Sequence, residues 1–400
     1  MKNVSLSERI LYIDVLRACA LLFILLVHCR YSFSCLSGPQ EVLFRVPVGD
    51  SVVDWLGFCY MIDTGFLMFA FLFGISFFLQ MNRAALKGVD FRGRFAWRMA
   101  LLAGMGLLHF GLFVGDILFL LGVCGLLLIV LWKMSSRFLV VLALCCLFVP
   151  WMLRVEWDGS QHQSALDWIA QVLSVKRDAL AAGQQESEYS RSFLVTAGDR
   201  YEHIKFYWIA SFSARFWQIL FMSLLGVVCG CIGILTGARR CPLWIVAASV
   251  LLLLVPPLIL FDVGGLGAYY GQSASSFWAY CLYWGVHVSV AFALVALLYF
   301  FYYQTKAKNI LGEVLGNAGK ATFSCYIMQS LVLVPFFARW GLGYAGKLSP
   351  FVSFAIGLMF FGLQVWLCNI WMRRFRYGPL EYLWRSGTYL SWHAFRKQAE

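Results

Sequence analysis

The residues best suited to chemistry lie within an apolar stretch of the sequence. His109 and Asp116 are seven residues apart inside residues 99–132, which contain no lysine or arginine. A segment this apolar is expected in a lipid bilayer, where an ionisable side chain is costly and marks a functional site by default. Either the Asp116 carboxylate orients the His109 imidazole for proton transfer, or both residues only close a turn at Gly115 on the membrane surface.

A second group of ionisable residues lies in and just after the first apolar run, Leu11–Val27. Asp14 and Arg17 are three residues apart, close enough to pair on a helix. His28 follows Arg17 by eleven residues, about three helical turns, so both side chains are expected on one face, roughly 16 Å apart. In one interpretation Asp14 and Arg17 bind substrate, with Arg17 on the donor phosphates, and His28 acts as base or acyl carrier. In the other, Asp14 and Arg17 form a structural ion pair and His28 is an interfacial histidine.

Four further side chains are candidates for substrate binding. Asp63 interrupts the apolar run Trp55–Met81, and Arg98 ends a basic connection before the central apolar stretch. Tyr326 and Gln329 lie three residues apart in a later apolar run. These groups would line a polar path for substrate, or they would bond neighbouring helices to one another.

The motifs of several enzyme classes are absent from the sequence. It contains no G-x-x-x-x-G-K-[ST], no H-E-x-x-H and no G-x-S-x-G, which argues against an ATPase, a zinc protease and an α/β-hydrolase. The 13 cysteines include no C-x-x-C pair, so no metal site and no tightly bound cofactor is predicted. Among Cys29, Cys35 and Cys59 one pair could bridge on an oxidising face, although free thiols are expected.

Composition places the chain among membrane proteins. It is 61% hydrophobic and only 13% charged, with a mean hydropathy of +0.75, which an ordinary soluble domain does not reach. The net charge of +12 lies mainly in short loops between apolar runs. This distribution is typical of membrane topology and does not indicate a nucleic-acid partner.

The apolar runs predict an all-α, polytopic membrane bundle of about ten transmembrane helices. Twenty lysines and arginines fall in connections assigned to the cytoplasm and only four in the short outer connections, so both termini are predicted to be cytoplasmic. The predicted spans are Leu11–Val27, Trp55–Met81, the two helices of 99–132, Phe138–Leu153, Phe216–Thr236, Leu243–Phe261, Phe277–Phe301, Thr322–Phe337 and Phe351–Trp371.

One integral membrane domain is predicted over residues 1–400. It carries an outer loop at 154–211, in which 167–183 has the spacing of a short surface helix, and a loop is expected over Tyr31–Val53. A cytoplasmic amphipathic tail is predicted at 373–400, where the spacing lets Glu381 pair with Arg376 or Arg385.

Four stretches together resemble the YeiB-like family of bacterial inner-membrane proteins, also called domain of unknown function 418. They are RILYIDVLRACALLFILLVH, FLFGISFFLQMNRA followed by the central stretch with His109, Gly115 and Asp116, GNAGKATFSCYIMQS, and RYGPLEYLWRSGTY. Two positions depart from the family pattern, because His28 replaces a common Asn and Lys320 replaces a usual Arg. The first departure gives an Arg and a His separated by ten residues, which is similar to the motif of membrane acyltransferase-3 proteins.

The resemblance implies a multi-pass protein of the bacterial inner membrane. Through its distant similarity to acyltransferase-3 proteins and heparan-glucosaminide acetyltransferases, it implies transfer of an acyl group from cytoplasmic acyl-CoA to an envelope glycan or another small polar acceptor. A small-solute transporter is the alternative, since a transport role has been suggested for the family. A third alternative is a structural or signalling membrane protein without catalysis, in which the ionisable residues tolerate substitution.

Overall fold

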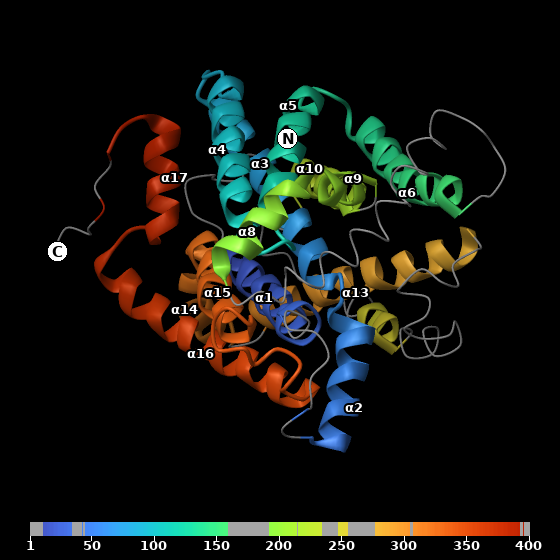
Figure 1. Cartoon of the computed structure of the whole chain (residues 1–400). Coiled ribbons are helices and arrows are strands. Elements are labelled where there is room, and N and C mark those ends of the chain that lie inside the picture. Colours follow the sequence, from blue (N-terminus) through green and yellow to red (C-terminus); the bar gives the residue numbers. More distant parts are fainter. Residues whose placement is uncertain are drawn as a thin grey trace.

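The computed structural model describes residues 11–33, 42, 45–158, 192–213, 215–233, 247–254, 277–304, 307–392 and 395, and these residues form helices and no strand (Figure 1). The predicted all-α class is therefore confirmed. The helices are α1 (Leu11–Val27), η1 (His28–Ser32), α2 (Pro47–Leu56), η3 (Gly57–Met61), α3 (Thr64–Leu86), α4 (Arg92–Phe110), α5 (Leu118–Leu131), α6 (Ser136–Asp158), α8 (Phe193–Glu202), α9 (Ile204–Ser213), α10 (Arg215–Ile232), α13 (Phe277–Gln304), α14 (Ala307–Lys320), α15 (Thr322–Phe337), α16 (Pro350–Arg374) and α17 (Pro379–Tyr389).

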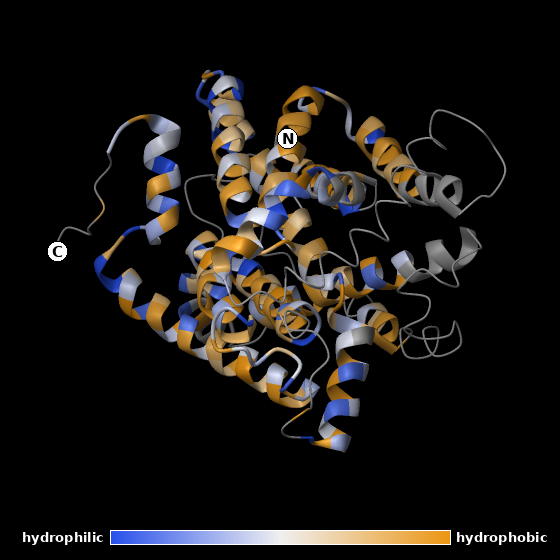
Figure 2. Cartoon of the chain, viewed as in Figure 1, coloured by the Kyte–Doolittle hydropathy of each residue, from blue (hydrophilic) through white to orange (hydrophobic). Residues whose placement is uncertain are grey.

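Several helices are built for a bilayer. Within the described residues, five helical segments are long and apolar enough to cross a membrane, and a sixth is obtained if the bent pair α14 and α15 counts as one span. Outward-facing residues of α16, including Met359 and Trp366, are large, apolar and exposed, as expected for lipid contact (Figure 2). The total of about ten spans stays a prediction, because most of Leu243–Phe261 lies outside the described residues.

The second predicted span is broken, and its start differs from the prediction. The sequence predicts a loop as far as Val53, but α2 already begins at Pro47, where proline is preorganised for the first helical position. The helix continues through η3 and breaks at Asp63, which has a φ of 61° before α3 begins. Aspartate tolerates this left-handed conformation better than most residues do, so the break coincides with the only acidic residue of the predicted run 55–81.

The predicted central hairpin is present as α4 and α5, which pack against each other and are joined by residues 111–117. Residues 154–211, the predicted outer loop, include the end of α6, all of α8 and most of α9, whereas the surface helix predicted at 167–183 lies outside the described residues. In the predicted tail, the amphipathic segment forms α17, which packs against α4 and α15 (Figure 1).

Helix α1 lies at the centre of the bundle. It packs against α3, α13, α14, α15 and α16, and most of its side chains are buried. The Tyr12 hydroxyl donates a hydrogen bond of 2.6 Å to the Val295 carbonyl of α13, which ties two segments far apart in sequence. Because nearly every face of α1 is covered, its polar residues must be partnered by neighbouring helices or must line a cavity.

Glycines bring α3 and α10 into close contact. A Cβ atom on Gly74 would collide with the backbone carbonyl of Ser223, and a Cβ on Gly226 would collide with the carbonyl of Phe71. The Ser223 hydroxyl also donates to the Ala70 carbonyl at 3.1 Å. Small residues that let backbones approach in this way are a typical means of helix association in membranes.

We expect Gly74→Ala to destabilise the protein by about 1–3 kcal/mol, because backbone cannot move aside as a flexible side chain can. The matched control is Gly104→Ala in α4, where an added Cβ meets nothing within 4 Å. That change should be neutral or stabilise the helix by up to about 1 kcal/mol. Thermal unfolding of both variants in detergent tests this packing, and equal melting temperatures for the two would contradict it.

Candidate functional site

Two cavities lie inside the bundle, and together they contain most of the predicted site residues. The first, which we call the basic cavity, has a volume of about 270 Å³ and is walled by α1, α3, α4, α5, α14, α15 and α17. Its charged lining residues are Arg17, Arg98, Lys320, Glu381 and Arg385. Four cations and one carboxylate, set among aromatic and aliphatic walls, suit an anionic ligand that also has an apolar part.

The second cavity, which we call the histidine cavity, has a volume of about 210 Å³. Its polar lining residues are His28, Tyr31, Ser32, Asp63, Arg215 and Tyr326. Both signs of charge, hydroxyl groups and an imidazole face this space, so it suits a small polar molecule.

The two cavities meet at a shared wall. Ile24 of α1, Ile117 before α5 and Tyr326 of α15 line both of them. The acyl-transfer interpretation expects Arg17, His28, His109 and Asp116 to face one common chamber, and this expectation is wrong. Arg17 lines the basic cavity, His28 lines the histidine cavity, and the other two line neither, so acyl transfer would have to take place across the shared wall.

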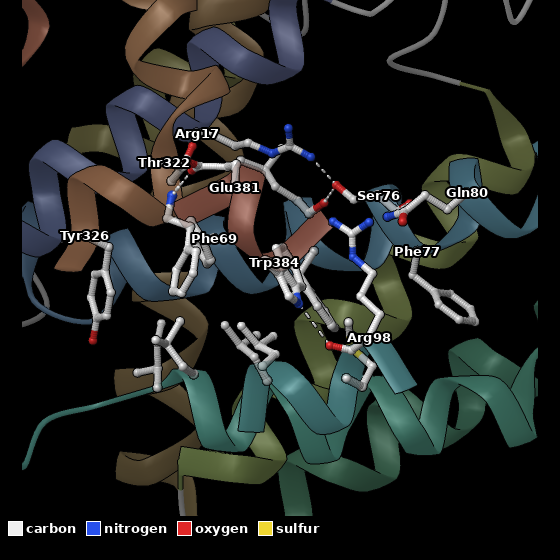
Figure 3. Close-up of a pocket in the computed structure, with 18 of the residues that line it drawn as sticks. Arg17, Phe69, Ser76, Phe77, Gln80, Arg98, Thr322, Tyr326, Glu381 and Trp384 are labelled. Carbon is white, nitrogen blue, oxygen red and sulfur yellow. Dashed lines mark hydrogen bonds between the residues drawn. The ribbon is translucent and has the colours of Figure 1, made fainter. Parts of the chain in front are cut away.

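Arg17 is held by a buried carboxylate and a hydroxyl. Its guanidinium donates to Asp14 at 2.9 Å and to the Ser76 Oγ atom at 2.5 Å, and the Asp14 side chain is only 2% exposed. Figure 3 shows Arg17, Ser76 and Arg98 converging on one region of the basic cavity, with Tyr326 at its other end. Asp14 therefore positions Arg17, and it does not itself line either cavity.

His109 and Asp116 form a buried pair beside the shared wall. The His109 Nδ1 atom lies 2.7 Å from Asp116 Oδ1, and both side chains are at most 3% exposed. The Tyr326 hydroxyl donates to the same carboxylate oxygen at 3.5 Å. The other oxygen accepts from the backbone N–H groups of Leu118 and Phe119 at 3.0 and 3.2 Å, so Asp116 also caps the start of α5.

This pair leaves the second imidazole nitrogen unused. Among the described residues, His109 Nε2 is buried and has no hydrogen-bond partner. A histidine whose Nδ1 is bonded to a carboxylate presents Nε2 for proton exchange, as in hydrolase triads. The pair is thus oriented for general-base chemistry, although His109 lines neither cavity.

His28 lies where α1 changes into the wider turn of η1. Its ring contacts Phe113 with a centroid distance of 4.8 Å, and the ring of His109 lies 6.3 Å from that same phenylalanine. The two predicted histidines therefore flank Phe113, one of them in the histidine cavity and the other behind its wall.

Arg215 is a cavity residue that sequence reasoning did not single out. It begins α10, lines the histidine cavity, and lies 4.0 Å from Asp63. In the sequence, Arg215 looks like any other cation that flanks an apolar run. Only its contact with Asp63 in the folded structure identifies it as a site residue.

Gln329 joins two helices and lines neither the basic cavity nor the histidine cavity. Its amide donates to Gln364 of α16 at 2.9 Å, and Gln364 donates in turn to the Cys325 carbonyl at 2.8 Å. Cys325 and Cys368 place their sulfurs 3.3 Å apart in the same interface. These contacts favour the interpretation that Gln329 bonds α15 to α16 over the interpretation that it binds substrate.

Neither a disulfide nor a cluster of potential metal ligands is found among the described residues. Cys29 and Cys59 are free thiols there, and Cys35 lies outside the described residues. Within the described residues, no group of three or more His, Cys, Asp or Glu could hold a metal ion.

Glu381 has a role that the sequence did not predict. Instead of pairing with Arg376 or Arg385, it bonds the start of α15, which is bent by 77° from α14. Glu381 Oε1 accepts from the backbone N–H groups of Phe323 and Ser324 at 2.7 and 3.1 Å, and Oε2 accepts from the Ser324 hydroxyl at 2.5 Å. A carboxylate at a helix N-terminus satisfies N–H groups that have no partner within the helix.

Burial makes this carboxylate costly in its charged form. It raises the pKa of Glu381 above the ordinary value of 4.5, while the hydrogen bonds from Ser324 and Phe323 act in the opposite direction. The folded protein thus favours the neutral form more than the unfolded chain does. The group's contribution to stability is largest below the ordinary pKa and is lost as the pH rises through the raised value.

We therefore expect the melting temperature of the wild type, relative to that of Glu381→Gln, to fall as the pH is raised from 4.5 towards neutrality. Tryptophan fluorescence during heating measures this difference. Asp90→Asn is the control, because hydrogen bonds from Arg92 lower the pKa of exposed Asp90 to about 2, so it stays ionised over this range. A wild-type to Glu381→Gln difference that does not change with pH would contradict burial as the main influence.

Comparison with known proteins shows similarity to a family of membrane proteins. Residues 229–391 match the family model described as "Protein of unknown function (DUF418)". The chain is 28% identical over 98% of both sequences to "Uncharacterized protein YxaH" of Bacillus subtilis (strain 168). It is also 32% identical over 105 residues to "Uncharacterized protein YeiB" of Escherichia coli (strain K12), covering 24% of this chain and 25% of that protein. The predicted resemblance to the YeiB-like, DUF418 family is confirmed.

The DUF418 match spans the carboxyl-terminal side of the candidate site. It includes the bend between α14 and α15, Tyr326 in the shared wall and the capping residue Glu381. Arg17, His28 and the His109–Asp116 pair lie outside that match, in a region aligned with YxaH as part of the full-length similarity. This chain is thus similar to YeiB-like, DUF418 proteins, and its candidate site is assembled from both halves of the sequence.

Proposed function

We propose that this protein is an inner-membrane acyltransferase that moves an acyl group from cytoplasmic acyl-CoA to an envelope glycan or another small polar acceptor. One observation carries the proposal. A basic cavity and a histidine cavity meet at a wall made by Ile24, Ile117 and Tyr326, and the buried His109–Asp116 pair stands beside that wall. Transfer between two substrates needs such a meeting point, because the reacting atoms must approach to about 3–3.5 Å.

In this proposal the basic side faces the cytoplasm, and acyl-CoA is a substrate that the basic cavity binds, with no tightly bound cofactor. The acceptor occupies the histidine cavity, between Asp63 and Arg215. Its hydroxyl oxygen forms a bond to the thioester carbonyl carbon as the carbon–sulfur bond breaks. The hydroxyl proton passes through His28 or His109 to the departing thiolate, so no oxidant or reductant is needed.

The groups around the two histidines are consistent with a donor in the basic cavity and an acceptor in the histidine cavity. Asp116 holds His109 through Nδ1 and would stabilise the imidazolium formed on proton uptake. Tyr326 contacts the same carboxylate from the shared wall, so a shift of this side chain would bring the two substrates together. Asp14 serves as the positioning residue for Arg17, which contacts the donor.

A small-solute transporter is the second candidate, and one observation favours it. The helix pair α14 and α15 bends by 77° beside the basic cavity, and discontinuous helices often form transporter binding sites. The third candidate, a structural or signalling protein, requires cavity residues that can be replaced without functional loss.

Vesicles containing the purified protein and labelled acyl-CoA test the first candidate. We expect label on an added polar acceptor, with His28→Ala or His109→Ala lowering the rate by about 10²–10⁴-fold, the usual contribution of a general base. His203→Ala is the matched control, because His203 bonds Asp199 in α8 and lines neither cavity.

The same vesicles separate the alternatives. Uptake of labelled solute without transfer to acceptor supports a carrier and removes the acyltransferase proposal. Unchanged behaviour of the His28, His109 and Arg17 variants in both assays supports a protein without catalysis.

A further inference from the structure

Arg98 is a half-buried cation that lines the basic cavity. Its side chain enters the cavity from α4, and its guanidinium carbon lies 4.0 Å from the centre of the Trp384 ring (Figure 3). Among the described residues it forms no ion pair, and its Nε atom is buried without a hydrogen-bond partner. Arg385 lines the same cavity, and its Nε atom is also buried without a hydrogen-bond partner among the described residues. Because these two guanidinium donors face a cavity, they are available to an anionic ligand that enters it.

Glu381 already supplies one negative charge to this cavity from within the protein. It is the only acidic residue among the described residues that line the basic cavity, and it occupies the N-terminus of α15, where backbone N–H groups favour an anion. With Arg17, Arg98, Lys320 and Arg385 around the same space, the lining has three more cations than anions. A group carrying two negative charges and several acceptor oxygens would match these donors better than one carboxylate does.

We propose that the basic cavity binds the phosphate group of an amphipathic ligand, and that Glu381 occupies the anion position at α15 until this phosphate displaces it. The phosphate bonds the N–H groups of Phe323 and Ser324 together with the Arg98 guanidinium. Assigning this phosphate to the acyl donor rests on the proposed function, whereas phosphate binding itself does not.

Displacement of Glu381 does not require the whole of α17 to leave. Trp384 Nε1 donates to the Arg98 carbonyl at 3.0 Å, and Trp97 Nε1 donates to the Gly387 carbonyl at 3.0 Å. These bonds hold α17 against α4 independently of Glu381, so rotation of one side chain can vacate the position. The burial that raises the pKa of Glu381 also lowers the cost of removing its charge from this position.

The walls account for the apolar part of the ligand. Phe69, Phe73 and Leu121 line the same cavity. A phosphate attached to an acyl or alkyl chain therefore places both of its parts in matching surroundings. Coenzyme A thioesters and anionic lipids share this chemistry and differ in whether the ligand comes from solution or from the bilayer.

Binding to the full-length protein in phosphatidylcholine nanodiscs tests the proposal, with coenzyme A as the soluble probe and titration calorimetry as the measurement. Arg98→Gln should weaken binding by about tenfold or more, as expected for loss of a hydrogen bond to a charged group. Glu381→Ala should tighten it by about tenfold, because the internal competitor is removed. Arg94→Gln is the matched control, since Arg94 stacks on Tyr389 one helical turn earlier and does not line the cavity.

Nanodiscs containing phosphatidic acid identify the source of the phosphate. Competition between this lipid and coenzyme A would support a phosphate site that a lipid can occupy. The same conclusion follows if coenzyme A does not bind but the lipid co-purifies with the wild type and not with Arg98→Gln. Glu381→Gln keeps the shape of the side chain, so it serves as a second variant in case Glu381→Ala does not fold. It should bind the probe at least as tightly as the wild type.

Three results overturn the inference: neither phosphate probe binds, Arg94→Gln weakens binding as much as Arg98→Gln, or both Glu381 variants bind more weakly than the wild type. Binding of coenzyme A without acyl transfer would remove the proposed function and leave the phosphate site. Acyl transfer that does not depend on Arg98 would support the proposed function and remove the phosphate site.

Discussion

The cost of an unpartnered charge inside a membrane protein governs how this molecule is built. Helix α1 is covered on almost every side, yet it carries Asp14 and Arg17. The two satisfy each other at 2.9 Å, and Ser76 of α3 accepts a second hydrogen bond from Arg17. The same requirement joins His109 to Asp116 and Gln329 to Gln364. Polar residues thus fix which helices are neighbours, while glycines such as Gly74 fix how closely they approach.

Features that depend on local sequence were predictable. The bounds of α15 agree with the predicted run Thr322–Phe337, because an apolar segment between polar connections determines a helix by itself. The central hairpin was likewise visible from its turn at Gly115, and the resemblance to YeiB-like proteins followed from motifs spread over the chain. The helix beginning at Pro47 was missed, since its first residues include Gly49, Asp50 and Ser51, which are as typical of a loop as of a helix start.

Features that depend on the tertiary arrangement were not predictable. Spacing along α1 indicated that Arg17 and His28 share a face, but only the packing of α15 against α1 divides the space they face into two cavities. Arg215 becomes a site residue through Asp63, which is 152 positions away in the chain. Glu381 had two cations at helical spacing on its own segment, and it bonds the backbone of another helix instead.

The bond between Glu381 and α15 also bears on the order in which the chain completes its structure. The first N–H groups of α15 have their acceptor, Glu381, 57 and 58 residues later in the chain. While the chain emerges, the start of α15 is therefore an unfinished helix end beside the basic cavity. The start of α15 therefore gains its acceptor only after α17 has been synthesised and has packed against it, so docking of α17 is a late step in completing this part of the bundle.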